Sequence, residues 1–119
     1  MISDVGKLQQ ILHKVTLPYV EHNECQDLLQ AVPELSAKFK LDESFICAGG
    51  DGLADTCEGD GGGALFCPLK ADPNRMVQVG IVATGFGCGK PNVPGMYASV
   101  MHGLCFIKTD TFCKVRNWL

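Results

Sequence analysis

The stretch "CEGDGGGALFC", residues 57–67, decides how this sequence is interpreted. Two cysteines enclose four glycines and two acids, with no serine, threonine or histidine between them. Glycine loses more conformational freedom on folding than any other residue, so such a run indicates a loop whose backbone follows an unusual path. The stretch therefore has the backbone of a reactive loop and lacks the side chain that would react.

Composition narrows the class of protein. The 119 residues are 46% hydrophobic, which is enough for one small domain with a core. A formal net charge of -3 and the absence of any Lys/Arg block argue against nucleic-acid binding. No apolar run reaches the roughly 18 residues that a membrane span needs. The first ten residues, "MISDVGKLQQ", lack the basic-then-apolar layout of a signal peptide.

Seven cysteines are a high number for this length. Such density is typical of a disulfide framework formed in an oxidising compartment, and the odd count leaves at least one thiol without a partner in the chain. No CxxC pair occurs, and none of His13, His22 and His102 stands at zinc-finger spacing from a cysteine. We therefore expect a secreted, disulfide-bonded protein with no structural metal site and no cofactor.

Patterning predicts mainly strands. The expected strands are residues 8–20, 44–50, 64–69, 76–85 and 96–100. The turn signal "ADPNR" should join the third and fourth of them into a hairpin. Residues 23–37 show helical periodicity, with Asn23 as the expected N-cap and Pro33 as the expected end, and residues 102–112 suggest a C-terminal helix. Short strands with frequent turns indicate an all-β barrel or sandwich.

Four motifs occur in a fixed order: "CAGG" at 47–50, "DTCEGDGGGALFC" at 55–67, "GIVATGFGCG" at 80–89 and "VPGMYASV" at 93–100. Their order and spacing resemble the C-terminal half of the trypsin-like serine proteases, over about residues 7–107. The resemblance implies an incomplete six-stranded antiparallel barrel with a C-terminal helix. Residues 1–119 would then be a partial peptidase S1 domain that lacks the N-terminal barrel, which carries the catalytic His and Asp.

The family's loop reads Cys-x-Gly-Asp-Ser-Gly-Gly-Pro-Leu, with the serine as nucleophile. In this chain Gly61 stands at that serine and Ala64 at the proline. The resemblance implies an oxyanion hole formed by the amides of Gly59 and Gly61, which would face a developing negative charge. It also implies that this hole has no nucleophile beside it.

Further positions carry over by the same resemblance. Asp55 matches the aspartate at the floor of the specificity pocket, which would favour Arg or Lys side chains, and Gly85 and Gly95 match the small residues of the pocket walls. Asp60 matches the aspartate that pairs with the new amino terminus after zymogen cleavage. The family's usual Ser-Trp before the first wall glycine reads Ala83-Thr84, so an aromatic wall is lost.

Removing the nucleophile of such a triad costs about a million-fold in rate, or roughly 8 kcal/mol. We therefore interpret the chain as a non-catalytic protease homologue. A Gly in "GDGG" at the serine position is most similar to the clip-domain serine protease homologues of arthropods. This resemblance implies a secreted parent protein that binds active serine proteases or their targets in innate immunity and melanisation.

The family also implies the disulfides. Cys25 would pair with Cys47, and Cys57 with Cys88, whereas the partner of Cys67 would lie in an upstream strand. Without that strand, the barrel would expose two edges and part of its core, so the isolated chain is not expected to fold stably.

Two further cysteines, Cys105 and Cys113, have no match in the common trypsin pattern and could pair with each other. Eight residues of unbroken helix span about 12 Å, too far for a disulfide. Either the terminal helix stops near Thr109 or these thiols pair elsewhere.

Other interpretations remain open. A trypsin-like endopeptidase of Arg/Lys specificity would need a substitute nucleophile such as Thr56, and a truncated product without function is a third hypothesis. The glycine loop could cradle phosphate, but no Lys-Ser/Thr follows it. Its acidic residues could bind calcium, but their spacing misses the EF-hand pattern. Asp55 could be a plain turn residue, and the stripe Leu28, Leu29, Val32 and Leu35 is expected to be core packing.

Overall fold

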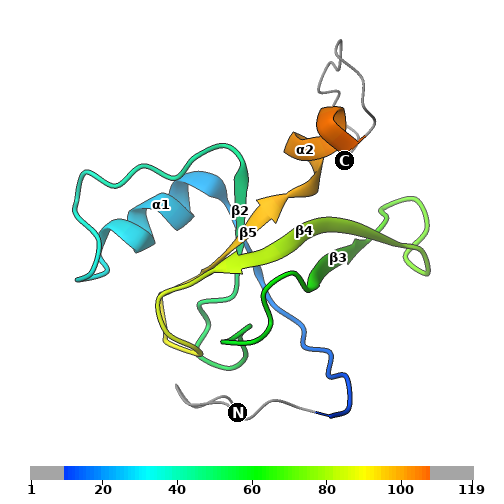
Figure 1. Ribbon diagram of the computed structural model, residues 1–119, viewed down its shortest axis with the longest axis horizontal. Helices are drawn as coiled ribbons and strands as arrows, with labels where there is room; N and C mark the ends of the chain where they lie inside the picture. Colours follow the sequence, from blue (N-terminus) through cyan, green and yellow to red (C-terminus); the bar gives the residue numbers. More distant parts are fainter. Residues whose placement is uncertain (1–9, 108–119) are drawn as a thin grey trace.

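The computed structural model describes residues 10–107, and its centre is one five-stranded antiparallel sheet (Figure 1). The strand order is β1-β2-β5-β4-β3. The strands are β1 (Tyr19–Val20), β2 (Phe45–Ala48), β3 (Ala64–Pro68), β4 (Met76–Thr84) and β5 (Gly95–Ser99), and the helices are α1 (His22–Gln30) and α2 (Val100–Ile107). The expectation of an antiparallel all-β fold with a C-terminal helix is confirmed.

The predicted hairpin joins β3 to β4, which pair in antiparallel register from Ala64–Ile81 to Pro68–Met76. Its turn is closed by a hydrogen bond of 2.9 Å from the amide of Leu69 to the carbonyl of Arg75. The carboxylate of Asp72 accepts from the amide of Asn74 at 3.1 Å, the local bond for which aspartate is favoured in turns.

The predicted first strand is wrong over most of its length. Within the described residues 10–20, only Tyr19–Val20 pairs with β2, and residues 10–18 form no strand; residues 8 and 9 lie outside the described part. Strand order places β1 at an edge of the sheet, and Pro18 has no amide proton to donate to a ladder. A strand needs a neighbour, and among the described residues this segment has one for two residues only.

The helix boundaries also differ from the prediction. Glu21, not Asn23, is the N-cap of α1, and its carboxylate accepts from the amides of Asn23 at 2.9 Å and Glu24 at 3.3 Å. The helix ends at Gln30, ahead of Pro33, which disfavours helical backbone in the residue before it. Helix α2 begins at Val100, two residues earlier than expected, and the predicted end at 112 lies outside the described residues.

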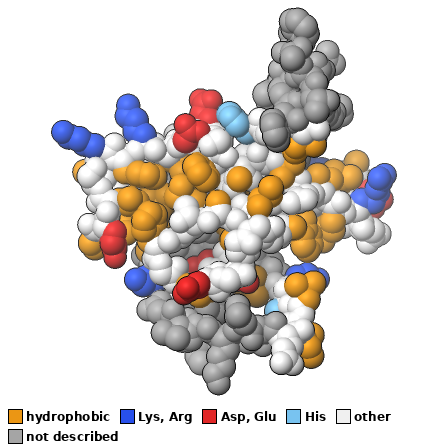
Figure 2. Space-filling view, viewed as in Figure 1, with side chains coloured by type: hydrophobic (Ala, Val, Ile, Leu, Met, Phe, Trp, Pro, Cys, Tyr) orange, Lys and Arg blue, Asp and Glu red, His pale blue; other side chains and the backbone are white. Residues whose placement is uncertain are grey.

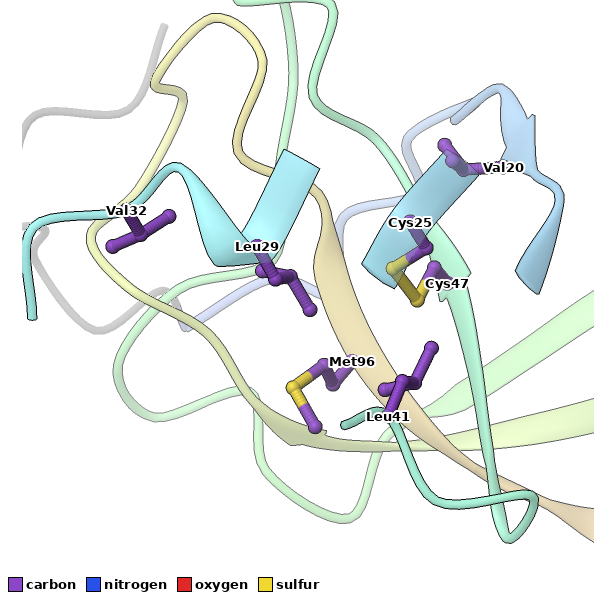
Figure 3. Packing of buried hydrophobic residues seen from close by; sticks show 7 residues of the cluster. All are labelled: Val20, Cys25, Leu29, Val32, Leu41, Cys47 and Met96. Carbon is purple, nitrogen blue, oxygen red and sulfur yellow. A yellow bond between two sulfur atoms is a disulfide. The ribbon is translucent and has the colours of Figure 1, made fainter. Parts of the chain in front are cut away.

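The core lies between α1 and the end of the sheet formed by β2 and β5 (Figure 3). The disulfide of Cys25 and Cys47 ties helix to strand, and Leu29 extends from the helix toward Met96 of β5. The buried cluster consists of Val20, Cys25, Leu29, Val32, Leu41, Cys47 and Met96. Leu28 and Leu35 pack against it, so the apolar stripe is core packing as expected.

Beyond the part of the sheet that packs against α1, apolar side chains of β3 and β4 are exposed. Cross-strand pairing aligns Ala64, Ile81, Ala98 and Phe45 in one row across β3, β4, β5 and β2. Figure 2 shows hydrophobic side chains gathered both over α1 and over the β3–β4 hairpin. On the hairpin, Phe66, Met76 and Ile81 are exposed. A search of residues 10–107 finds no helix with the length and hydropathy of a membrane span.

Candidate functional site

A cavity of about 450 Å³ opens between the glycine-rich loop, the end of β4 and the loop that leads into β5. Five residues predicted to form the site line it: Asp55, Gly59, Gly61, Gly85 and Gly95. Asp60 does not line the cavity. The structure thus gathers around one pocket residues that are up to 40 positions apart in the sequence (95 minus 55).

Asp55 is the buried acid of this pocket, with 5% of its surface exposed. One carboxylate oxygen accepts from the amide of Thr56 at 2.8 Å, and the other accepts from the amide of Gly89 at 2.9 Å. A buried carboxylate without such donors would be strongly disfavoured. Main-chain amides therefore hold Asp55 in place without neutralising its charge.

Burial raises the pKa of Asp55 above the usual 3.8, and the hydrogen bonds from the amides of Gly89 and Thr56 act in the opposite direction. Beside it, Tyr97 is fully buried, and its hydroxyl is hydrogen-bonded to that of Thr56 at 3.0 Å. Burial also raises the pKa of Tyr97, against the effect of this hydrogen bond. The pocket lining thus contains the acid Asp55 and, next to it, Thr56, whose hydroxyl is paired with a buried tyrosine behind the lining.

Glycines leave the pocket open. A Cβ atom added at Gly85 would lie 4.0 Å from the Cα of Gly95, so the two residues face each other across a narrow gap. A Cβ added at Gly95 would lie 3.3 Å from the Tyr97 hydroxyl and 3.6 Å from Asp55 Oδ1. A larger residue at either position would narrow the way to the carboxylate.

The glycine loop is held by its own backbone and by β4. The carboxylate of Asp60 accepts from the amide of Cys57 at 2.7 Å, and the amide of Asp60 donates to the carbonyl of Cys57 at 2.9 Å. The amide of Gly62 donates to Val82, which donates to Gly63 in return. In the described part of the chain, neither the amide of Gly59 nor that of Gly61 has a protein acceptor.

Gly61 occupies a position that a side chain could enter. A Cβ atom added there meets no atom within 4 Å, and its φ lies outside the left-handed region. Gly62 has equally open space, but its φ of +87° is one that residues with a side chain rarely adopt. Backbone geometry therefore requires glycine at 62 and not at 61.

We expect Gly61→Ser to leave the free energy of unfolding unchanged or to raise it by up to about 1 kcal/mol, because serine restricts the unfolded chain. The matched variant Gly62→Ser should lower it by about 1 kcal/mol, since a left-handed residue with a Cβ is strained. Urea denaturation of both variants, made in the longer protein that contains this chain, measures the difference. Equal losses would show that the loop needs glycine at both positions.

Both disulfides implied by the family are present. Cys25 pairs with Cys47, and Cys57 pairs with Cys88, which joins the glycine loop to the opposite pocket wall. Cys67 is half-buried on β3 and is a free thiol in the structure. The suggested pair of Cys105 and Cys113 lies outside the described residues.

Sequence reasoning missed several pocket features. The hydrogen bond between Thr56 and Tyr97, the amide of Gly89 on Asp55 and the presence of Lys90 in the lining are examples. None of His13, His22 and His102 lines the pocket. Among residues 10–107, no group of three or more His, Cys, Asp or Glu side chains could hold a metal ion.

Comparison with known proteins gives the family of this chain. The sequence profile of the trypsin family matches residues 2–107, which is most of the chain. The chain belongs to the trypsin family. It is 50% identical to phenoloxidase-activating factor 2 of Galleria mellonella over 95 residues. The aligned residues make up 80% of this chain and 31% of that protein.

Two further relatives extend the comparison. The inactive CLIP domain-containing serine protease A3 of Aedes aegypti is 43% identical over 96 residues, covering 80% of this chain and 20% of that protein. Trypsin-1 of Astacus astacus is 36% identical over 109 residues, covering 91% of this chain and 42% of that protein. The chain thus spans less than half the length of these relatives, and several clip-domain relatives are named inactive.

Proposed function

We propose that this chain is part of a secreted, non-catalytic serine protease homologue that acts as a binding partner or cofactor in a protease cascade of innate immunity and melanisation. The observation that supports the proposal is that Gly61 lines the pocket and has open space where a side chain would lie, while the trypsin-like resemblance assigns the nucleophile to this position. Relatives support the proposal: one, at 50% identity, is a phenoloxidase-activating factor, and others are named inactive serine proteases.

The chemistry of the pocket separates binding from catalysis. Gly61 offers no oxygen to attack a peptide bond, and the hydroxyl of Thr56 is hydrogen-bonded to Tyr97 behind the pocket lining. Without a nucleophile, the oxyanion hole and binding retain only about a thousand-fold acceleration over water, too little for peptide hydrolysis. The Asp55 carboxylate lines the pocket, and the amides of Thr56 and Gly89 favour its charged form, so a basic side chain of a partner protein is the ligand that we expect there.

Benzamidine is the probe for this pocket, because its amidinium group resembles the end of an arginine side chain. The secreted protein that contains this chain should bind benzamidine and leave arginine esters intact. Asp55→Asn should lower the affinity about tenfold to a hundredfold, as expected when a charged hydrogen bond is lost. Affinity should also fall as the pH drops through the raised pKa of Asp55, because the protonated carboxyl no longer attracts a cation.

A second assay, with the same proteins, tests the role in the cascade. Added to an active clip-domain protease with its prophenoloxidase, the secreted protein should increase phenoloxidase activity and should produce none alone. The Asp55→Asn variant should lose this increase in proportion to its lost benzamidine binding. Ester hydrolysis by the unmodified protein, abolished in Asp55→Asn, would contradict the proposal and indicate an enzyme.

A further inference from the structure

Lys90 lies on a loop that is fastened to the pocket on both sides. One residue before it, the amide of Gly89 donates to Asp55 at 2.9 Å, and two residues after it, the amide of Asn92 donates to the carbonyl of Gly50 at 2.8 Å. The Cys57–Cys88 disulfide holds the same loop against the glycine-rich loop. The backbone of Lys90 is therefore fixed relative to the Asp55 carboxylate.

The side chain of Lys90 lies across Gly87, in the space that a side chain at 87 would fill. A Cβ atom added at Gly87 would lie 2.5 Å from the Cε of Lys90 and 2.8 Å from its Nζ. Gly87 has a φ of +90°, a backbone conformation that favours glycine, whereas the flexible end of the lysine can shift to admit a side chain. The lysine stem thus lies over Gly87 at the pocket wall, while the residue as a whole stays exposed.

This placement puts a cation into the lining of an otherwise acidic pocket. Asp55 and Glu58 are the anionic residues of the lining, and Lys90 is its cationic residue. An incoming guanidinium or amidinium group would be attracted by the acid on the floor and repelled by the ammonium on the wall. The ammonium group stays solvated because Lys90 is exposed, so its effect depends on ionic strength.

We propose that Lys90 is a specificity-determining residue of this pocket, which weakens the binding of cationic side chains through its charge. This inference rests on the proposed function, in which the pocket receives a basic side chain. At the separations found within one pocket, a single solvated charge changes affinity by about three- to tenfold at low salt. Lys90 would then keep the pocket from binding basic side chains indiscriminately.

The experiment measures benzamidine affinity by titration calorimetry on the secreted protein that contains this chain. Lys90→Gln keeps the length of the side chain and removes its charge, so affinity should rise about three- to tenfold at low salt and less at physiological salt. Lys90→Glu should raise it further. Lys70→Gln, a change at an exposed lysine outside the pocket lining, is the matched control and should change little.

Benzamide, the uncharged counterpart, separates charge from steric blocking. Its affinity should not differ between the unmodified protein and Lys90→Gln, and an equal gain for both ligands would overturn the proposal. Equal benzamidine affinities for Lys90→Gln and Lys70→Gln would overturn it as well, while leaving the proposed function standing. If no variant binds benzamidine, the pocket does not receive cations, and the proposed function fails with the inference.

Discussion

Expressed alone and fully oxidised, the 119-residue chain is expected to show no cooperative thermal unfolding transition. The sheet ends in two edge strands, and β1 contributes only two residues to its edge. Open edges present unpaired amides and carbonyls that favour aggregation. Apolar side chains are also left in water, among them Leu12 with 98% and Met76 with 56% of the surface exposed.

Calorimetry and light scattering test this expectation together. We expect a broad or absent heat-absorption peak and concentration-dependent association. A matched variant, Phe66→Ser with Met76→Ser, removes two exposed apolar side chains of the hairpin and should reduce association without creating a transition. A sharp, reversible transition of the unmodified chain at low concentration would contradict the expectation and show that this half-domain is a folding unit.

Replacing Cys25 and Cys47 by alanine is expected to lower the free energy of unfolding by about 4 kcal/mol. The bond closes a loop with a sequence separation of 22, which is worth about 3 kcal/mol in chain entropy. Both residues are fully buried in the hydrophobic cluster, so the loss of two sulfur atoms adds about 1 kcal/mol of packing. Urea denaturation of the secreted protein that contains the chain measures the change.

The second disulfide is the control for this prediction. Cys57 and Cys88 close a loop with a sequence separation of 31, so the chain-entropy stabilisation lost on removing them is about 3.7 kcal/mol, a few tenths above that of the first pair and below its total with packing. They line the pocket and stand outside the hydrophobic cluster. Their replacement should therefore cost less stability than that of the first pair and more benzamidine affinity. The opposite ranking would show that the core does not depend on Cys25 and Cys47.

Sequence alone predicted most of what surrounds the pocket. The resemblance to the trypsin-like proteases implied Asp55, Gly85 and Gly95 as pocket residues and both disulfides, and the structure brings these three residues to one cavity and forms both bonds. The hairpin was predicted from its local turn signal. The roles assigned to Gly59, Gly61 and Asp60 stay predictions, and Asp60 accepts a hydrogen bond from its own loop.

The features that the sequence analysis mispredicted or missed depend on tertiary contacts, which a local sequence pattern does not reveal. Residues 10–18 have the composition of a strand, but a strand forms only beside a partner. Glu21 caps α1 because its backbone is extended at the position where the helix starts, and Asn23 lies inside the first turn. No sequence pattern distinguishes Lys90 from other lysines in loops, because its position depends on the space left by the missing side chain of Gly87.

The way Asp55 is held has a consequence for the history of this protein. Its carboxylate is fixed by the amides of Thr56 and Gly89, groups that every non-proline residue supplies. Substitutions by residues other than proline at Thr56 or Gly89 therefore leave both donors to this carboxylate in place. Loss of a reactive side chain from the glycine loop would therefore not disturb the hydrogen bonds that hold this carboxylate. In such a scaffold, the groups that would react and the groups that hold the acidic residue of the pocket can change independently.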